Sequence, residues 1–164
     1  MEIQQFINEN SDYISIFKEK GFQCKRRKGL LLVKHPYHMK IDTESPELRW
    51  MRYCRGVLID TSRNRVISVP PIKSREIQWS DMSDLIGSYE YQPLIDGTMV
   101  NLCHYEGEWL LTTRGNIGGH NKWKIHESHT SSFHKMFGDC GVNYGSLDPR
   151  YSYSFVMRHL DNRI

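Results

Sequence analysis

The chain has 164 residues, 38% of them hydrophobic and 12% aromatic, which fits one globular domain with its own core. Its net charge of +3 permits contact with nucleic acid without demanding it, and no apolar run is long enough to cross a bilayer. Residues 1–5 lack the basic and apolar regions of a signal peptide, so we expect a cytoplasmic or otherwise intracellular protein that is not secreted.

The first part of the chain predicts helices followed by a strand. Apolar residues recur at helical spacing through residues 1–21 and stop at Gly21, which predicts one long helix or two short ones. The basic cluster 25–28 precedes an apolar run, 30–33, that is typical of a buried strand. We interpret the basic cluster as a solvated strand edge, with an RNA phosphate contact as the alternative. Residues 35–38 predict a loop that exposes its two histidines.

The next segment predicts a helix and a pair of strands. Ser45-Pro46 has the pattern of a helix N-cap followed by proline at the first helical position. Residues 57–60 and 65–69 are β-rich runs, joined by the polar turn 61–64 and stopped by two prolines. This arrangement is typical of an antiparallel hairpin.

The rest of the chain predicts a second hairpin, a helix and a closing strand. Alternating apolar residues in 93–100 and 109–115 flank the tight reversal 106–108. The segment 122–137 favours a helix, and tyrosine and phenylalanine alternate with serine in 151–155, as in a strand. We therefore expect an α+β fold of antiparallel sheets with flanking helices.

Five short motifs, in a fixed order, link residues 48–164 to a known family. They are Arg55-Gly56, Pro70-Pro71-Ile72-Lys73, Asp96-Gly97, Thr113-Arg114-Gly115 and Asn162-Arg163-Ile164. In these motifs the chain resembles the ATP-dependent RNA ligases of the phage and tRNA-repair type, which are covalent nucleotidyltransferases. The resemblance implies one ligase-like nucleotidyltransferase domain over residues 1–164, with an ATP-grasp-like fold and an N-terminal helical segment at about 1–21.

Two catalytic positions of that family are changed in this chain. In the family motif Lys-x-Asp-Gly the lysine takes up AMP, and Leu94 stands at that position. Val156 stands where the family has an active-site glutamate. Leucine has no lone pair with which to attack the α-phosphate, so we expect no catalytic residue and no self-adenylation. Two later family motifs, a glutamate strand and a Lys-x-Lys strand, have no counterpart in the sequence, which favours a degenerate and truncated relative.

The resemblance also implies nucleotide- or phosphate-binding residues. The candidates are Arg55, Gly56, Lys73, Asp96, Gly97 and Arg114. Each has a purely structural alternative: Asp-Gly is a common pair at the end of a strand, and Arg55 pairs with Asp60 or Glu90. ATP and Mg²⁺ are the implied cofactors if the family activity is retained, and otherwise none. Neither the histidines nor the four separated cysteines have the spacing of a metal site, so we expect no metal ligand.

Two functions remain open at this point. In the first, the chain has lost self-adenylation and acts as a nucleotide-binding, RNA-binding or structural pseudoenzyme module. In the second, it is a fragment or inactivated variant of a true ATP-dependent RNA ligase that seals RNA ends. The changed catalytic positions favour the first, with RNA or a larger viral or RNA–protein assembly such as a virion as the expected partner, and no membrane. A pseudoenzyme further predicts that Leu94 is packed as an apolar strand residue.

Overall fold

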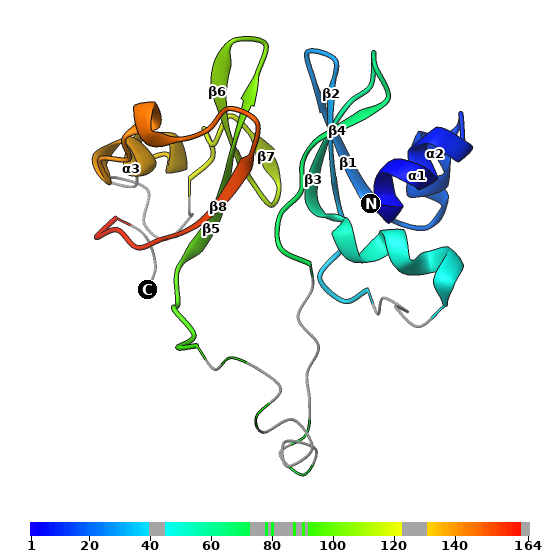
Figure 1. Cartoon of the computed structure of the whole chain (residues 1–164), viewed down its shortest axis with the longest axis horizontal. Helices are drawn as coiled ribbons and strands as arrows, with labels where there is room; N and C mark the ends of the chain where they lie inside the picture. Colours follow the sequence, from blue (N-terminus) through cyan, green and yellow to red (C-terminus); the bar gives the residue numbers. More distant parts are fainter. Residues whose placement is uncertain are drawn as a thin grey trace.

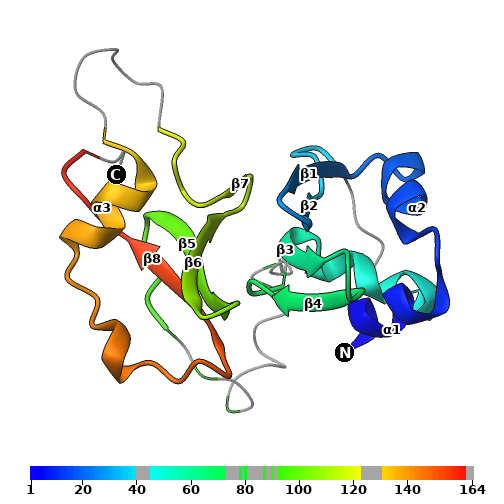
Figure 2. The ribbon, with the colours of Figure 1, turned by 90° about the horizontal axis from the view of Figure 1, so that it is seen from above.

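The computed structural model has an α+β fold with two four-stranded antiparallel sheets, which confirms the predicted fold class (Figure 1). The two sheets face each other, and each sheet has its helices on the side away from the other sheet (Figure 2). None of the described helices is long and apolar enough to cross a membrane. The residues that the structure describes are 1–39, 45–72, 78, 80, 87, 90, 92–122 and 131–161.

The first sheet has the strand order β1-β2-β3-β4, and each neighbouring pair is antiparallel. Its strands are β1 (Gln23–Arg27), β2 (Leu30–Lys34), β3 (Arg55–Asp60) and β4 (Arg65–Ser68). One face is covered by α1 (Glu2–Glu9), α2 (Tyr13–Glu19) and the 3₁₀ helix η1 (Pro46–Tyr53). The N-terminal segment therefore forms two short helices, which was one of its two predicted forms.

Strand β2 is buried on both faces, as its uninterrupted apolar run predicts. Leu31 and Val33 pack beneath the helices in one core with Trp50. Leu30 and Leu32 point the other way and pack in a second core with residues of the second sheet. The first sheet is therefore the middle layer between helices and the second sheet.

The second sheet has the order β7-β6-β5-β8. Its strands are β5 (Thr98–Tyr105), β6 (Glu108–Thr113), β7 (Asn116–Ile117) and β8 (Ser152–Met157). The outer face packs against α3 (Phe133–Asp139), and the 3₁₀ helix η3 (Tyr144–Ser146) lies in the connection to β8. Glu106 and Gly107 join β5 to β6 with φ angles of 51° and 88°, as a two-residue hairpin requires, which confirms the predicted reversal.

Two predicted boundaries were wrong. The strand expected over 93–100 begins at Thr98, because residues 93–96 are exposed and residues 93–97 have no partner strand among the described residues. The helix expected over 122–137 begins only at Phe133, where the Ser132 side chain accepts a hydrogen bond from the Lys135 amide. Residues 123–130, in the middle of that prediction, lie outside the described residues.

The facing sides of the two sheets meet in an apolar layer that joins Leu32 and Leu58 to Cys103 and Ile117. Burial raises the pKa of the Cys103 thiol to about 11, against a smaller lowering effect of the Ser68 hydroxyl. The Cys103 thiolate is therefore disfavoured, and the residue acts as a small apolar side chain.

Polar contacts join the sheets around the buried carboxylate of Asp60, the last residue of β3. This is the end of the layer where the β3–β4 and β5–β6 turns lie, which is the upper end in Figure 1. Tyr105 donates a hydrogen bond to Asp60 Oδ2 across 3.1 Å, and Arg63 contacts the same oxygen at 2.9 Å. Burial alone would raise the pKa of Asp60, but hydrogen bonds from Ser62, Tyr105 and Arg63 outweigh it and hold that pKa well below its usual range. We call Asp60, Arg63, Tyr105 and Glu106 the upper end of the interface.

Candidate functional site

The predicted Arg55, Gly56 and Arg114 come together at the opposite end of the interface. Arg55 and Gly56 open β3, and Arg114 lies in the turn between β6 and β7. Gly56 has a φ of +110°, and a Cβ there would lie 3.0 Å from the Cα of Arg114. Only glycine adopts this backbone readily while allowing the other chain so close. Gly56 thus lets the backbone of Arg114 lie against β3.

The two arginines are close enough to affect each other. The pKa of Arg55 is lowered, first because the side chain is partly buried and then because the positive charge of Arg114 repels it. Arg55 donates a hydrogen bond to the Ile72 carbonyl at 3.2 Å. Neither expected partner is paired with it: Asp60 binds Arg63, and Glu90 accepts a hydrogen bond from Gln92.

Arg114 is held by the backbone of the first sheet. Its Nη2 donates to the His35 carbonyl at 3.2 Å and lies 3.4 Å from His35 Nδ1. Its Nε is buried and has no hydrogen-bond partner among the described groups. His35 itself is buried, with 5% of its surface exposed, so the prediction that both histidines of this loop are exposed holds for His38 but was wrong for His35.

A third cation, Lys34, joins this group and was missed in the sequence. Lys34 pairs with Arg55 in the β2–β3 ladder, and its Nζ would lie 3.0 Å from a Cβ on Gly115. The sequence contained one indication of this position. Lys34 is the first charged residue after the buried apolar run of β2, and such a residue lies at the end of a strand, where its side chain can reach solvent. We call Lys34, Arg55 and Arg114 the cationic end of the interface.

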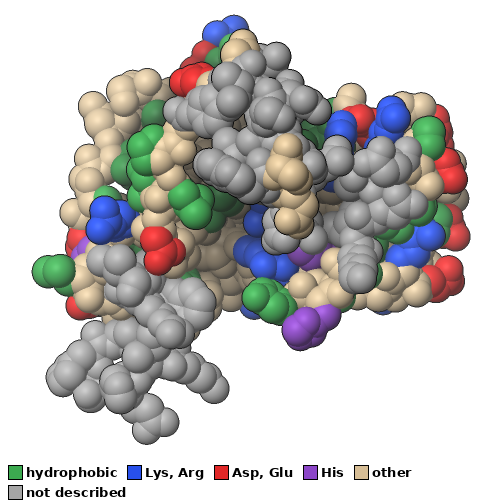
Figure 3. Space-filling model, turned by 90° about the horizontal axis from the view of Figure 1, so that it is seen from below, with side chains coloured by type: hydrophobic (Ala, Val, Ile, Leu, Met, Phe, Trp, Pro, Cys, Tyr) green, Lys and Arg blue, Asp and Glu red, His purple; other side chains and the backbone are tan. Residues whose placement is uncertain are grey.

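The cationic end contains no compensating carboxylate within the described part of the chain. None of the ion pairs between described residues involves Lys34, Arg55 or Arg114. Figure 3 views the molecule from this end and shows Lys and Arg side chains gathered between its two halves. Converging cations without counter-charges are suited to bind an anion with several negative oxygens.

The Asp96-Gly97 motif reaches β8 rather than the arginines. A Cβ on Gly97 would lie 2.7 Å from the Met157 carbonyl oxygen and 2.9 Å from Val156 Cγ1, so the motif packs closely on that strand. Asp96 is exposed. Its carboxylate makes no ion pair with a described residue. The remaining candidate, Lys73, and the final Asn-Arg-Ile motif lie outside the described residues.

The environment of Leu94 contradicts the expectation that it is a packed strand residue. Its side chain is 99% exposed in the segment before β5. Val156 lies on β8 opposite Met99 and is 43% exposed. The family positions for lysine and glutamate therefore hold apolar side chains that are open to solvent, and neither contributes to the core.

The chain was compared with protein-family models, curated proteins and solved structures, and no significant match was found. In the part of the chain that the structure describes, no three His, Cys, Asp or Glu side chains are grouped to hold a metal ion. What the site can bind therefore follows from its charges and hydrogen-bonding groups.

Proposed function

We propose that this protein binds a nucleotide through its phosphates at Lys34, Arg55 and Arg114, as an RNA-ligase-like module that does not attach AMP to itself. The observation that supports the proposal is that Arg55 and Arg114 lie close together and that no carboxylate of a described residue forms an ion pair with either of them. An anion supplies the missing charge and relieves their repulsion.

Two further features support a phosphate ligand. The buried Nε of Arg114 has an N–H group without a partner among the described residues, and a phosphate oxygen is a strong acceptor for it. Gly56 lets the backbone of Arg114 lie against β3, and the Arg114 guanidinium donates to the His35 carbonyl just after β2, so donors from both sheets converge on one region. Bound phosphate therefore also joins the two sheets.

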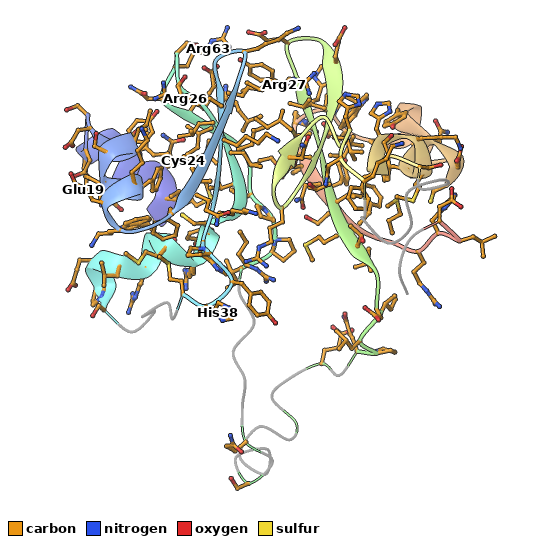
Figure 4. All side chains as sticks on the ribbon, turned by 180° about the vertical axis from the view of Figure 1, so that it is seen from behind. Glu19, Cys24, Arg26, Arg27, His38 and Arg63 are labelled. Atoms are coloured by element: carbon orange, nitrogen blue, oxygen red, sulfur yellow. The ribbon has the colours of Figure 1, made fainter. Side chains whose placement is uncertain are left out.

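Binding of ATP at low salt, measured by titration calorimetry, tests the proposal. Replacing Arg55 by glutamine should weaken ATP binding by about 1–3 kcal/mol, the usual contribution of a charge-assisted hydrogen bond. Arg26→Gln is the matched control, because it removes the same charge from β1, on the side of the helices near Tyr13 (Figure 4). Undetectable ATP binding by the parent protein at low ionic strength, where screening is weakest, would refute the proposal.

The absence of self-adenylation is tested separately. After incubation with radiolabelled ATP and Mg²⁺, the denatured protein should carry no label, because Leu94 offers no nucleophile. Acid-labile, amine-linked AMP on any lysine would contradict this.

An inactivated true ligase is the second candidate, and the exposure of Leu94 and Val156 makes it testable. Leu94→Lys with Val156→Glu restores both family groups without burying a charge, so the double variant should fold with little loss of stability. In the pseudoenzyme that we propose, this variant still takes up no AMP. If the double variant carries radiolabelled AMP after denaturation, the result would favour the inactivated ligase.

A further inference from the structure

A groove with an apolar floor lies on the outer side of the first sheet, where α1, α2 and η1 meet (Figure 2). Its volume is about 510 Å³, within the range of about 300–1,000 Å³ that ordinary ligand pockets occupy. Phe6 of α1, Ile16 of α2 and Leu48 of η1 line it, and each of them is half-buried. Apolar side chains that line a surface groove with a polar rim are typical of a site where another molecule docks.

The floor of the groove is held in place by aromatic packing. The Phe6 ring stacks on Trp50, with ring centroids 4.0 Å apart and an angle of 13° between the rings. Phe17 packs against both rings, with centroid distances of 5.6 Å to Phe6 and 5.4 Å to Trp50. Phe6 and Leu48 also contact the core beneath the helices. The floor is therefore preformed, and a ligand that binds there does not have to order it first.

The rim of the groove is mainly acidic. Glu2, Glu9 and Glu47 line it, together with one ammonium group, that of Lys20. Glu2 is already paired, because it contacts Arg52 at 2.6 Å. Glu9 and Glu47 form no ion pair with a described residue. The groove thus presents unpaired negative charge on a protein whose net charge is +3.

The two unpaired carboxylates lie at the same end of the groove. Glu2 begins α1 and contacts Arg52 near the end of η1, so α1 and η1 run in opposite directions. The last residue of α1, Glu9, is therefore placed at the same end as Glu47, which lies at the beginning of η1. Glu9 also stands at the negative end of the helix dipole, and the last turn of α1 contains no basic residue. A cation bound there is attracted by both carboxylates and by the helix end.

We propose that this groove binds a basic segment of a partner protein, with an aliphatic side chain on the apolar floor and an arginine or lysine at Glu9 and Glu47. The charge of the rim favours a cationic segment, and the floor accommodates an apolar anchor beside the cation. The carboxylates repel an acidic segment. The groove lies on the helix-covered face of the first sheet and the cationic end lies at the interface on its other face. The inference therefore does not depend on the proposed function.

An NMR titration with short peptides tests the proposal. The first probe is a tetrapeptide amide with two central arginines and a leucine at each end, added to the isotope-labelled full chain. Shifts of the backbone amide signals should concentrate in α1, the end of α2 and η1. A peptide with glutamate in place of arginine, and one with serine in place of leucine, should each bind at least about tenfold more weakly. Equal binding of the basic and acidic peptides, or no shift in these elements, would overturn the proposal.

Glu9→Gln tests the charge of the rim. It should lower the affinity for the basic peptide about threefold to fivefold, and the melting temperature should stay the same or rise, because a carboxylate leaves the negative end of a helix. Glu19→Gln is the matched control: Glu19 is exposed and ends α2 as Glu9 ends α1, but it does not line the groove. It should leave the affinity unchanged. Equal losses in the two variants would show that only overall charge attracts the peptide, and the groove would be excluded.

Two further variants give effects of opposite sign. Lys20→Gln removes the one cation that lines the groove, so the basic peptide should bind about twofold to threefold more tightly. Ile16→Ala shortens the floor and should lower the affinity for the leucine peptide about threefold, while that for the serine peptide stays unchanged. Alanine is the stronger helix former, so α2 should persist in this variant. Unchanged affinity for the leucine peptide in Ile16→Ala would contradict an apolar anchor in the groove.

A second copy of this chain is the alternative occupant, because its basic cluster 25–28 has the required charge. Sedimentation velocity of the full chain without peptide separates the two cases. For a separate partner protein, the sedimentation coefficient should not increase with protein concentration, in the parent or in Glu9→Gln. Concentration-dependent association that Glu9→Gln abolishes would assign the groove to self-association and overturn the proposal.

Discussion

The two ends of the inter-sheet interface contain similar numbers of charged groups but differ in how those charges are matched. At the upper end, the buried Asp60 carboxylate accepts hydrogen bonds from Arg63 and from Tyr105 of the other sheet. At the cationic end, Arg55 and Arg114 face each other with no described carboxylate between them. A matched network holds a fold together, whereas an unmatched one is stabilised by binding something else. We infer that the upper end stabilises the fold and that the cationic end binds a ligand.

The largest expected effect is the loss of the Asp60 network. Asp60→Ala should lower the free energy of unfolding by about 3 kcal/mol, because it leaves Tyr105 and the Ser62 groups without their acceptor at a buried position. Urea denaturation measures this. ATP affinity of the folded variant should be unchanged, since Asp60 lies at the upper end. A loss of less than about 1 kcal/mol would mean that the two sheets are held mainly by their apolar layer.

The same carboxylate predicts an acid-sensitive fold. The pKa of Asp60 is lower in the folded protein than in the unfolded chain, so its stabilising contribution is complete above the unfolded value and is lost as the pH falls below about 4. In Asp60→Asn this part of the pH dependence should disappear. Identical acid-denaturation curves for parent and Asp60→Asn would show that other carboxylates dominate.

The next largest effect is expected from Gly56→Ala at the cationic end. A φ of +110° is strained for alanine, and its Cβ would lie 3.0 Å from the Arg114 backbone. We expect a stability loss of about 2 kcal/mol together with weaker ATP binding, because the two arginines are pushed apart. Gly107→Ala is a useful comparison: it shares the positive φ but has open space around it. It should be destabilising without affecting ATP binding.

A smaller effect of opposite sign is expected for Arg55→Gln without ligand. Removing one of two repelling cations relieves their repulsion, while the hydrogen bond to the Ile72 carbonyl can be kept by the glutamine amide. Stability should therefore be unchanged or higher by up to about 0.5 kcal/mol, although ATP binding falls. A stability loss above about 1 kcal/mol would show that Arg55 is a structural residue.

The difference between the two ends also marks what the sequence could predict. The α+β class, the helical character of residues 1–21 and the Glu106-Gly107 reversal follow from local patterns, because spacing and turn residues act over a few positions. Arg55 and Arg114 were predicted only through the order of the motifs. Their proximity depends on Gly56 and on the packing of one sheet against the other, which no local pattern encodes.

The errors have the same origin. Leu94 continues an alternating apolar pattern, yet it is exposed, because a strand also needs a neighbour with which to pair. Lys34 joins the cations only through the β2–β3 register. Each missed feature depends on long-range pairing.

The smallest expected effect is at the exposed ion pair of the upper end. Arg63 and Glu106 join the tips of the two sheets at 3.3 Å, but both side chains are more than half exposed. Water and salt screen such a pair, so Glu106→Gln should change stability by less than about 0.5 kcal/mol, as measured by urea denaturation. Glutamine keeps the size of the side chain at a position with positive φ, which makes the variant a clean test of charge. If this change instead cost as much as Asp60→Ala, the upper end would depend on charge pairing between the sheets rather than on the buried Asp60 acceptor.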